Sequence, residues 1–427
     1  MAKITAFQGI RFNLNNGHKL KLDDLTTQPY DKITPEGVEK YYQKSPYNSI
    51  RLILGKNDDP MPGKDFYERA TKYLDQWQKE NILISETEPA LYPYFQTFTL
   101  KDGTKHIRQG FIAAVQTEPY ENKIIFPHER TLSGPKADRL KLIQATGTQM
   151  EQIFFLYQDK EKKTNQLMNQ FIASNKPIME TTDEYGVLHQ VWKITDAKLL
   201  NELTGLIAQM KLMIADGHHR YETTLNYSKE NPKARNILAT LVNGYDEGLV
   251  VLPTHRLVHS LANFDLEKLL TQLGDLYDIK REKKNDLKTV TSAYQAGVKT
   301  PYHYVFVTAD ETIRLVPKDV NAIKKTMAGA PKVLAELDVY FLHQVILQKH
   351  LNISLEDQAK YTYLKYFREI DEALQGLKKV PGQVLILQNP CSIDQVFDVA
   401  LGGEVMPQKS TDFYPKLLTG LLFLPIK

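Results

Sequence analysis

The sequence predicts a mixed α/β (α+β) protein with more than one domain, and three observations support this. Its 427 residues exceed what one hydrophobic core usually organises. Apolar side chains recur every three or four residues over 65–77, as on one face of a helix. Residues 92–100 and 108–117 instead alternate and favour β-forming side chains on either side of a turn at 101–104, which indicates a hairpin.

Composition predicts a folded protein of a reducing compartment. Hydrophobic residues make up 42% and charged residues 25% of the chain, which is typical of globular domains. The 54 basic and 51 acidic residues leave a formal net charge of +3, so charge does not indicate a nucleic-acid partner. One cysteine, Cys391, excludes an intrachain disulfide and a thiolate metal cluster. The first residues do not resemble a secretory signal and no apolar run approaches the roughly 20 residues that cross a bilayer, so we expect a cytoplasmic protein without a membrane partner.

The chain is expected to divide into three regions, at 1–125, 126–260 and 261–427. In the first region the run at 47–54 predicts a strand, and the helix at 65–77 and the hairpin follow it. The second region predicts a helix and several strands: 137–144, then 153–157, 209–214, 238–242 and 249–252. In the third region amphipathic helices alternate with strands: helices at 265–276, 338–350 and 354–358, strands at 302–307 and 383–387.

The strongest candidate site is the segment Asp216-Gly217-His218-His219-Arg220. A predicted strand ends just before Asp216, and a predicted helix begins near Arg220. Gly217 has no Cβ, so the backbone can turn sharply or approach a ligand closely there. The first turn of a helix has unpaired N–H groups and the positive end of the helix dipole, and here a guanidinium and two imidazoles accompany them. This combination predicts a phosphate-binding site.

Asp216 stands out as an acid in a basic segment. It could hold a divalent cation, accept the proton of a substrate hydroxyl, or orient one of the histidines. The alternative is that Asp216 only caps the helix and the histidines are ordinary polar residues of its first turn. A zinc site is not favoured, because the two histidines are adjacent rather than spaced for one ion.

A second candidate is Glu129, between His128 and Arg130. A glutamate flanked by cationic side chains just before a glycine–proline turn could act as a general base. A surface cluster of ion pairs would produce the same pattern.

Two further segments could supply phosphate contacts. His255 and Arg256 follow a strand and a proline, and they could also be a solvated strand end. Lys409, Ser410 and Thr411 lie among prolines and aromatic residues, so their loop could present cations and hydroxyls to an anion. It could equally fasten the following segment to the core.

Together, these motifs identify the chain as a member of a widespread bacterial and archaeal family, domain of unknown function 1015. The matching motifs occur in one order along most of the chain: Gln28-Pro29-Tyr30-Asp31, Asn48-Ser49-Ile50-Arg51, His128-Glu129-Arg130-Thr131 with Asp138-Arg139, and the segments 215–222, 253–256 and 409–416. Gln28 stands where the family commonly has a second proline. The family name implies no activity.

The region around 120–260 also resembles the ParB/sulfiredoxin superfamily, and in particular its free serine kinases. That resemblance implies a ParB/sulfiredoxin-like central domain flanked by N- and C-terminal α/β regions. In that superfamily a Gly-x-x-Arg turn at a helix start holds nucleotide phosphates, and 217–220 matches it. By order along the chain, Glu129 corresponds to the glutamate that acts near the serine hydroxyl.

We therefore expect a small-molecule phosphotransferase, with free serine as a candidate substrate and Mg²⁺ and ATP or ADP as cofactors. Glu129 or Asp216 would take the hydroxyl proton, and the turn at 217–220 would hold the phosphate. Two alternatives stay open. One is a phosphatase acting on a metabolite such as phosphoserine, with His218 or His219 as acid or nucleophile. The other is a nucleotide-sensing protein without catalysis.

Overall fold

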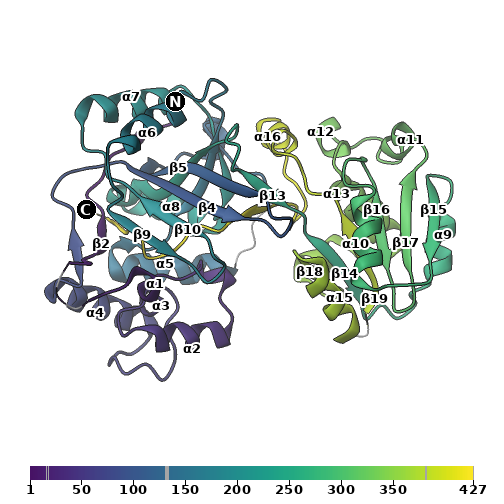
Figure 1. Ribbon diagram of the computed structural model, residues 1–427, viewed down its shortest axis with the longest axis horizontal. Helices are drawn as coiled ribbons and strands as arrows, with labels where there is room; N and C mark the ends of the chain where they lie inside the picture. The colour runs from purple at the N-terminus through teal and green to yellow at the C-terminus, as the bar shows by residue number, and fades with distance from the viewer. Residues whose placement is uncertain (16, 18, 130–133, 380–381, 427) are drawn as a thin grey trace. The chain divides into compact units, whose positions relative to one another are not determined.

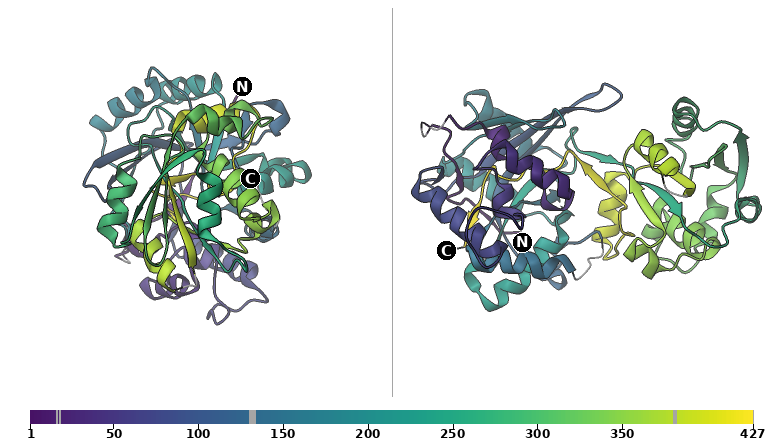
Figure 2. Two further views of the ribbon diagram at one scale, coloured as in Figure 1. Left: turned by 90° about the vertical axis from the view of Figure 1, so that its right-hand side faces the viewer. Right: turned by 90° about the horizontal axis from the view of Figure 1, so that it is seen from below.

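The structure is a computed structural model that describes the chain except for residues 16, 18, 130–133, 380–381 and 427. The chain folds into two compact units. Unit 1 comprises Met1–Pro127, Thr131–Val250 and Pro415–Lys427, and unit 2 comprises His128–Arg130 and Val251–Tyr414. Unit 2 is therefore inserted, in sequence, before the last segment of unit 1. Figure 2 shows each unit from two further sides.

Within the described residues, unit 1 is built on a nine-stranded mixed sheet. Eight strands follow the order β6-β11-β8-β12-β5-β4-β10-β9, and β1 pairs with β5. The pairs β6–β11 and β8–β12 are parallel, and the others are antiparallel. The strand bounds are Ile4–Thr5 (β1), Tyr92–Thr99 (β4), Lys105–Gln116 (β5), Ile125–Phe126 (β6), Ile153–Tyr157 (β8), Met179–Thr182 (β9), Leu188–Val191 (β10), Leu212–Asp216 (β11) and Asn236–Asn243 (β12).

Helices cover this sheet. Their bounds are Leu22–Leu25 (α1), Pro35–Lys44 (α2), Ile50–Ile53 (α3), Phe66–Lys79 (α4), Gly134–Thr146 (α5), Lys163–Ala173 (α6), Ala197–Ala208 (α7) and His218–Glu230 (α8). One face of the sheet forms a core with Met168 of α6, Leu203 of α7 and Tyr221 of α8. Helix α8 also packs on α5, and α5 packs on α4. Figure 1 shows α6 and α7 together on one side of the sheet.

The segment after unit 2 returns to unit 1 and is built into it. Strand β21 (Leu424–Pro425) pairs with β7 (Thr148–Gln149), and Phe423 forms a bridge with Ile10. Ile10 lies in β2 (Ile10–Phe12), which pairs with β3 (Leu83–Ser85). Leu421 and Phe423 are fully buried. The core of unit 1 therefore depends on residues that follow unit 2 in the chain.

Unit 2 contains a six-stranded antiparallel sheet in the described residues, with the order β15-β17-β16-β19-β14-β18. Its strands are His255–His259 (β14), Tyr277–Glu282 (β15), Tyr304–Val307 (β16), Thr312–Pro317 (β17), Leu364–Phe367 (β18) and Gly382–Gln388 (β19). Strands β13 (Val250–Leu252) and β20 (Asp412–Tyr414) are short.

Both faces of the second sheet are covered by helices. Helix α10 (Leu287–Gln295) and α15 (Ile370–Lys379) contribute to the core on one face. Helix α9 (Leu266–Leu273), α13 (Asp338–Phe341) and the π-helical turn Leu342–His350 contribute to the other. The remaining helices are Val320–Lys325 (α11), Lys332–Ala335 (α12), Leu355–Lys360 (α14) and Ile393–Leu401 (α16). No helix of the described residues is long and apolar enough to cross a membrane.

The mixed α/β class is confirmed, and one predicted strand is wrong. Residues 47–54 contain the short helix α3 rather than a strand. Asn48 explains the difference, because its Oδ1 accepts from the Ile50 N–H at 2.9 Å and turns the backbone. All four residues of α3 are buried, including the charged Arg51, so the order of polar and apolar residues does not show its period.

The division into two units differs from the three predicted regions. Strands β4 and β5, from the predicted first region, share one sheet with β8, β11 and β12 from the predicted second region. Hydrogen bonding across the boundary near residue 125 therefore places both regions in one unit.

Candidate functional site

The centre of the candidate site is the junction between β11 and α8 in unit 1. The strand ends at Asp216, and Gly217 occupies the N-cap position of the helix with a left-handed φ of 94°. A Cβ on Gly217 would lie 2.7 Å from Ile153 Cδ1 and 3.0 Å from Arg220 Nη2. The left-handed backbone conformation therefore favours glycine, and a Cβ would also force the ends of the Ile153 and Arg220 side chains to move. The predicted strand–turn–helix is confirmed.

Asp216 is paired with a cation rather than with the helix. Its Oδ2 lies 3.6 Å from Lys416 Nζ, and 29% of the Asp216 side-chain surface is exposed to solvent. Burial alone would raise the pKa of Asp216, but Lys416, Arg220 and the nearby Lys32 outweigh burial and hold this pKa below its usual value. Asp216 is therefore a carboxylate at neutral pH. It does not cap α8, because Gly217 holds the cap position and no side chain caps this helix.

Arg220 is held in position by a backbone hydrogen bond within unit 1. Its Nη1 donates to the backbone oxygen of Gln152 at 2.7 Å. Burial lowers the pKa of Arg220, but the nearby carboxylates of Glu151, Asp216 and Asp31 outweigh burial and raise it. The guanidinium is thus a permanent, positioned charge in the first turn of α8.

The two histidines of the turn differ in environment. His218 is buried, and His219 is partly exposed. Burial and the ammonium of Lys136 lower the pKa of His219. The imidazole of His219 is therefore neutral at physiological pH and able to accept a proton.

A group of residues from the N-terminal part of unit 1 supports this turn. The Tyr30 N–H donates to Glu151 Oε1 at 3.0 Å, and the Arg139 guanidinium lies over the Tyr30 ring at 4.4 Å. Arg139 also lies 3.4 Å from Glu151 and donates to the backbone oxygen of Ile53 at 2.8 Å. A small cavity of about 30 Å³ is bordered by Arg139, Glu151 and Arg220.

These supporting residues were not among the predicted site residues. Tyr30 and Arg139 lie within the quoted family motifs, so a sequence signal for them exists. Glu151 has no such signal, because it is an isolated acid in a polar segment. Lys416 lies 200 residues from Asp216, and only the fold brings the two together.

The other predicted residues belong to unit 2, where several of them meet. Glu129 Oε1 accepts from the Ser410 N–H at 3.2 Å and lies 3.5 Å from Thr411 Oγ1. His128 Nε2 lies 2.8 Å from the same Thr411 hydroxyl. The loop containing Lys409, Ser410 and Thr411 is thereby joined to the His128-Glu129 motif. Arg130 and Thr131 lie outside the described residues.

Arg256 and His255 are both buried in unit 2. Arg256 donates to the backbone oxygens of Thr254 and Lys409, the latter at 2.9 Å. Burial and Arg256 lower the pKa of His255 to about 3, so His255 is neutral. Arg256 therefore holds the loop at Lys409 in place, and a solvated strand end is not what the structure shows.

The predicted site residues thus form two groups. Asp216, Gly217, His218, His219 and Arg220 lie in unit 1, and Glu129, His255, Arg256, Lys409, Ser410 and Thr411 lie in unit 2. Among the described residues, no three His, Cys, Asp or Glu side chains gather in a way that could hold a metal ion. The neighbours of Asp216 are mainly cations, and they do not favour a resident Mg²⁺.

A family model described as "Protein of unknown function (DUF1015)" matches residues 4–340 of the chain. The protein belongs to the DUF1015 family. The resemblance read from the sequence motifs is therefore confirmed at the level of the family. No curated protein matches this DUF1015 chain.

Several solved structures are distantly similar to this DUF1015 protein. A conserved hypothetical protein from Pyrococcus furiosus is 14% identical with a TM-score of 0.33, over 70% of this chain and 93% of that one. A free serine kinase in complex with AMP is 12% identical with a TM-score of 0.35, over 70% and 89%. A C-terminally truncated SbnI from Staphylococcus aureus is 12% identical with a TM-score of 0.34, over 74% and 87%. Similarity at this level does not transfer an activity.

Proposed function

We propose that this protein binds a phosphate group of a nucleotide at the turn 217–220 and transfers a phosphoryl group to a small hydroxylated metabolite. The observation that carries the proposal is the left-handed Gly217 at the start of α8, with Arg220, Lys416 and Lys32 close to Asp216. Helix starts of this kind favour anions, and fixed cations add to the attraction.

The charge balance of this cluster supports an anionic ligand. Asp216 neutralises part of the charge of Lys416 and Arg220 and keeps both cations beside the turn. A phosphate carries up to two charges, so it can pair with Lys416 and Arg220 while Asp216 stays ionised. The proposal assigns neutralisation of the phosphate to these side chains rather than to a resident metal ion.

In the proposed reaction the hydroxyl oxygen of the acceptor attacks the terminal phosphorus of ATP or ADP. The bond from phosphorus to the bridging oxygen breaks, the shorter nucleotide leaves, and the hydroxyl proton passes to a base. Asp216 is a weak base because its pKa is lowered. His219 is neutral and partly exposed and is the stronger candidate in unit 1. Glu129, the base that the resemblance to free serine kinases suggests, lies in unit 2 and is not assigned a step at the turn of unit 1.

The test is a transfer assay on the full chain. We expect incubation with ATP or ADP, Mg²⁺ and a panel of hydroxy amino acids beginning with serine to give a phosphorylated product, measured by ³¹P NMR. Lys416→Met should lower the rate at least tenfold, because it removes a cation beside the turn. The matched control is Lys229→Met, an exposed lysine at the far end of α8, which should keep the rate.

The alternatives give different results in the same assay. Release of inorganic phosphate from phosphoserine without nucleotide would indicate a phosphatase. A rise in melting temperature with nucleotide but without product would indicate a sensor. If neither nucleotide nor inorganic phosphate changes the melting temperature, and Lys416→Met matches Lys229→Met in every readout, the phosphate site is absent and the proposal is wrong.

A further inference from the structure

The last segment of unit 1 brings Lys416 to Asp216, and a buried arginine of the sheet holds the backbone of this segment. Arg108 lies in β5, and only 1% of its surface is exposed. Its Nη2 donates to the backbone oxygen of Pro415 at 2.6 Å. Nε and Nη2 also donate to Gln96 Oε1, with a distance of 3.0 Å from Nε. Gln96, in β4, donates from Nε2 to the backbone oxygen of Lys416 at 2.9 Å.

These hydrogen bonds hold the peptide groups on both sides of Lys416. The Pro415 oxygen belongs to the peptide group that precedes Lys416, and the Lys416 oxygen belongs to the one that follows. Because peptide groups are planar, holding both of them leaves the φ and ψ angles of Lys416 little freedom. These angles set the direction of the Cα–Cβ bond. Arg108 and Gln96 therefore set the direction in which the lysine side chain leaves the backbone.

Arg108 contacts the other side of the Asp216–Lys416 pair as well. Its guanidinium carbon lies over the Phe154 ring, 4.7 Å from the ring centroid. Phe154, in β8, is the cross-strand partner of Asp216 in β11. The same guanidinium thus contacts the strand partner of Asp216 and the backbone beside Lys416. Its position bears directly on the distance of 3.6 Å between Asp216 Oδ2 and Lys416 Nζ.

The burial of Arg108 is costly and requires a reason other than packing. Burial lowers the pKa of Arg108 to about 10, so the guanidinium is still charged at neutral pH. Within the part of the chain that the structure describes, its hydrogen-bond acceptors are neutral oxygens and its Nη1 has no hydrogen-bond partner. A buried cation without a paired carboxylate is usually less stable than an apolar side chain of similar volume. The backbone that Arg108 holds accounts for a guanidinium at this position.

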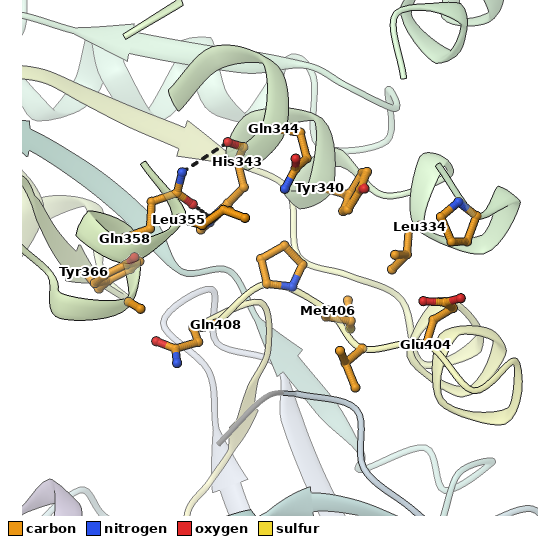
Figure 3. Close-up of a pocket in the computed structure, with 14 residues that line it drawn as sticks. Leu334, Tyr340, His343, Gln344, Leu355, Gln358, Tyr366, Glu404, Met406 and Gln408 are labelled. Carbon is orange, nitrogen blue, oxygen red and sulfur yellow. Dashed lines mark hydrogen bonds between the residues drawn. The ribbon is translucent and has the colours of Figure 1, made fainter. Parts of the chain in front are cut away.

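A buried arginine of unit 2 holds another part of the same C-terminal motif. Arg256 Nη2 donates to the backbone oxygen of Lys409 at 2.9 Å and lies 3.1 Å from His343 Nε2. Figure 3 shows His343 beside Gln358, whose Oε1 lies 2.7 Å from His343 Nδ1. In each unit a buried guanidinium, supported by a neutral side chain, thus holds a backbone oxygen of the motif 409–416.

We propose that Arg108 is a positioning residue of the phosphate site and acts through Gln96 and Pro415 to hold Lys416 beside Asp216. This role rests on the proposed function, which assigns Lys416 to the phosphate. If Arg108 only fastened the last segment to the sheet, its replacement would lower stability without a specific effect on Lys416. Experiments in which Lys416 or Asp216 is also replaced separate the two roles.

The first experiment measures the affinity of the full chain for inorganic phosphate by calorimetry. Arg108→Lys keeps the charge, but an ammonium cannot hold both partners in the fixed geometry of a guanidinium. We expect Arg108→Lys to weaken phosphate binding about fivefold, and by less than about twofold when Lys416→Met is already present. Thr164→Val is the matched control. It removes a buried, hydrogen-bonded hydroxyl of α6 in unit 1 and should leave the phosphate affinity unchanged.

The second experiment needs no phosphate and measures how far Asp216→Asn lowers the urea midpoint of unfolding. Burial raises the pKa of Asp216 and Lys416 opposes it, so displacement of Lys416 reduces the stability that the ionised carboxylate contributes. We therefore expect the loss at pH 7 to be smaller by about half or more in Arg108→Lys, and to vary less between pH 4.5 and pH 3. Part of the loss remains, because other groups also lower this pKa: Arg220, Lys32 and His218.

Gln96→Met is the second variant for both experiments. It keeps the approximate volume of the side chain and removes the donor to the Lys416 backbone oxygen. We expect the same direction of change as in Arg108→Lys, and Gln96→Met provides the result if Arg108→Lys does not fold.

Two results would contradict this role of Arg108. They are an equal loss of phosphate affinity in Arg108→Lys with and without Lys416, and an Asp216→Asn loss that keeps its size in Arg108→Lys. If phosphate binds and Lys416→Met weakens it while Arg108→Lys has no effect, the proposed function stands and Arg108 is not a positioning residue. If the unmodified chain binds neither phosphate nor nucleotide, the proposed function fails, and the urea experiment alone decides whether Arg108 positions Lys416.

Discussion

At the residue scale, the candidate phosphate site depends on a glycine, a carboxylate and a lysine. Gly217 sets the direction in which the chain enters α8, and Asp216 and Lys416 set the charge beside it. Gly217 and Asp216 could be predicted from the sequence, because glycine after a strand and before a helix has a direct conformational meaning. Lys416 could not be predicted as the partner of Asp216, since the pairing depends on how the last segment returns to unit 1.

Gly217→Ala tests the conformational part of this description. Alanine would have to adopt a φ of 94° and bring its Cβ to 2.7 Å from Ile153 Cδ1. We expect a loss of about 1–3 kcal/mol in the free energy of unfolding and weaker phosphate binding. Urea unfolding and phosphate-dependent melting measure the two effects.

The control is Gly205→Ala in α7, where a Cβ would meet no atom within 4 Å. An alanine inside an exposed helix turn should stabilise the protein by about 0.5–1 kcal/mol. Equal stability changes for Gly217→Ala and Gly205→Ala would contradict the assigned conformation of Gly217.

Asp216→Asn tests the electrostatic interaction between Asp216 and the cations around it. Because the folded state holds the pKa of Asp216 below its ordinary value of 3.8, ionised Asp216 stabilises the fold at pH values above about 4. This contribution is lost as the pH falls below 3.8 toward the folded-state pKa. We therefore expect Asp216→Asn to be less stable than the unmodified protein at pH 7, with the difference shrinking between pH 4.5 and pH 3.

Urea unfolding across this pH range gives the measurement. Asp275→Asn, an exposed carboxylate of unit 2, is the control and should show no such trend. When Lys416 is already replaced by methionine, Asp216→Asn should lower the free energy of unfolding at pH 7 by less than it does in the otherwise unmodified protein. A difference that is constant with pH would show that Asp216 is not held as a carboxylate by its neighbours.

At the scale of secondary-structure elements, long periodic segments could be predicted and short buried ones could not. Helix α4 matches the prediction for 65–77, and its N-cap Asp65 accepts from the Glu68 N–H at 2.9 Å. The hairpin of β4 and β5 matches as well. Helix α3 was missed because its four residues are buried on all sides and too few to show a period.

Asn48→Ala tests what holds α3 in place. The Asn48 amide donates to the backbone oxygens of Asp24 at 2.7 Å and Thr26 at 3.3 Å, while its Oδ1 accepts from Ile50. Alanine would leave these buried backbone groups unpaired, so we expect a loss of about 2–3 kcal/mol in unfolding free energy. Chemical unfolding is the measurement. Asn226→Ala on the exposed face of α8 should stay within about 0.5 kcal/mol of the unmodified protein, and equal effects at the two positions would refute this role.

At the scale of the whole molecule, the family and the mixed α/β class could be predicted, and the division into units could not. The order of elements along the chain does not show that β4 and β5 join β8, β11 and β12 in one sheet. Nor does it show that the last segment belongs with the first. Such pairings depend on contacts between residues far apart in the chain, such as Asn236 with Gln116 and Phe423 with Ile10, which local sequence patterns do not encode.

Phe423→Ala tests the dependence of unit 1 on this last segment. Phe423 is fully buried and forms a bridge with Ile10. We expect a loss of about 3–5 kcal/mol, confined to unit 1. Hydrogen exchange should show faster exchange in β5 and β12 while β16 and β19 of unit 2 are unchanged. Leu287→Ala, at an exposed position of α10, should alter neither unit, and faster exchange spread equally over both units would contradict the division.

The return of the chain to unit 1 also bears on its synthesis. Residues 415–427 leave the ribosome after all of unit 2, yet they supply core side chains and Lys416 to unit 1. During translation unit 2 can therefore become compact while unit 1 still lacks its last segment and part of the core of unit 1 is exposed to solvent. The charged turn at Asp216 acquires its lysine only after unit 2 has been synthesised, so a nascent chain stalled within unit 2 would carry an incomplete anion site.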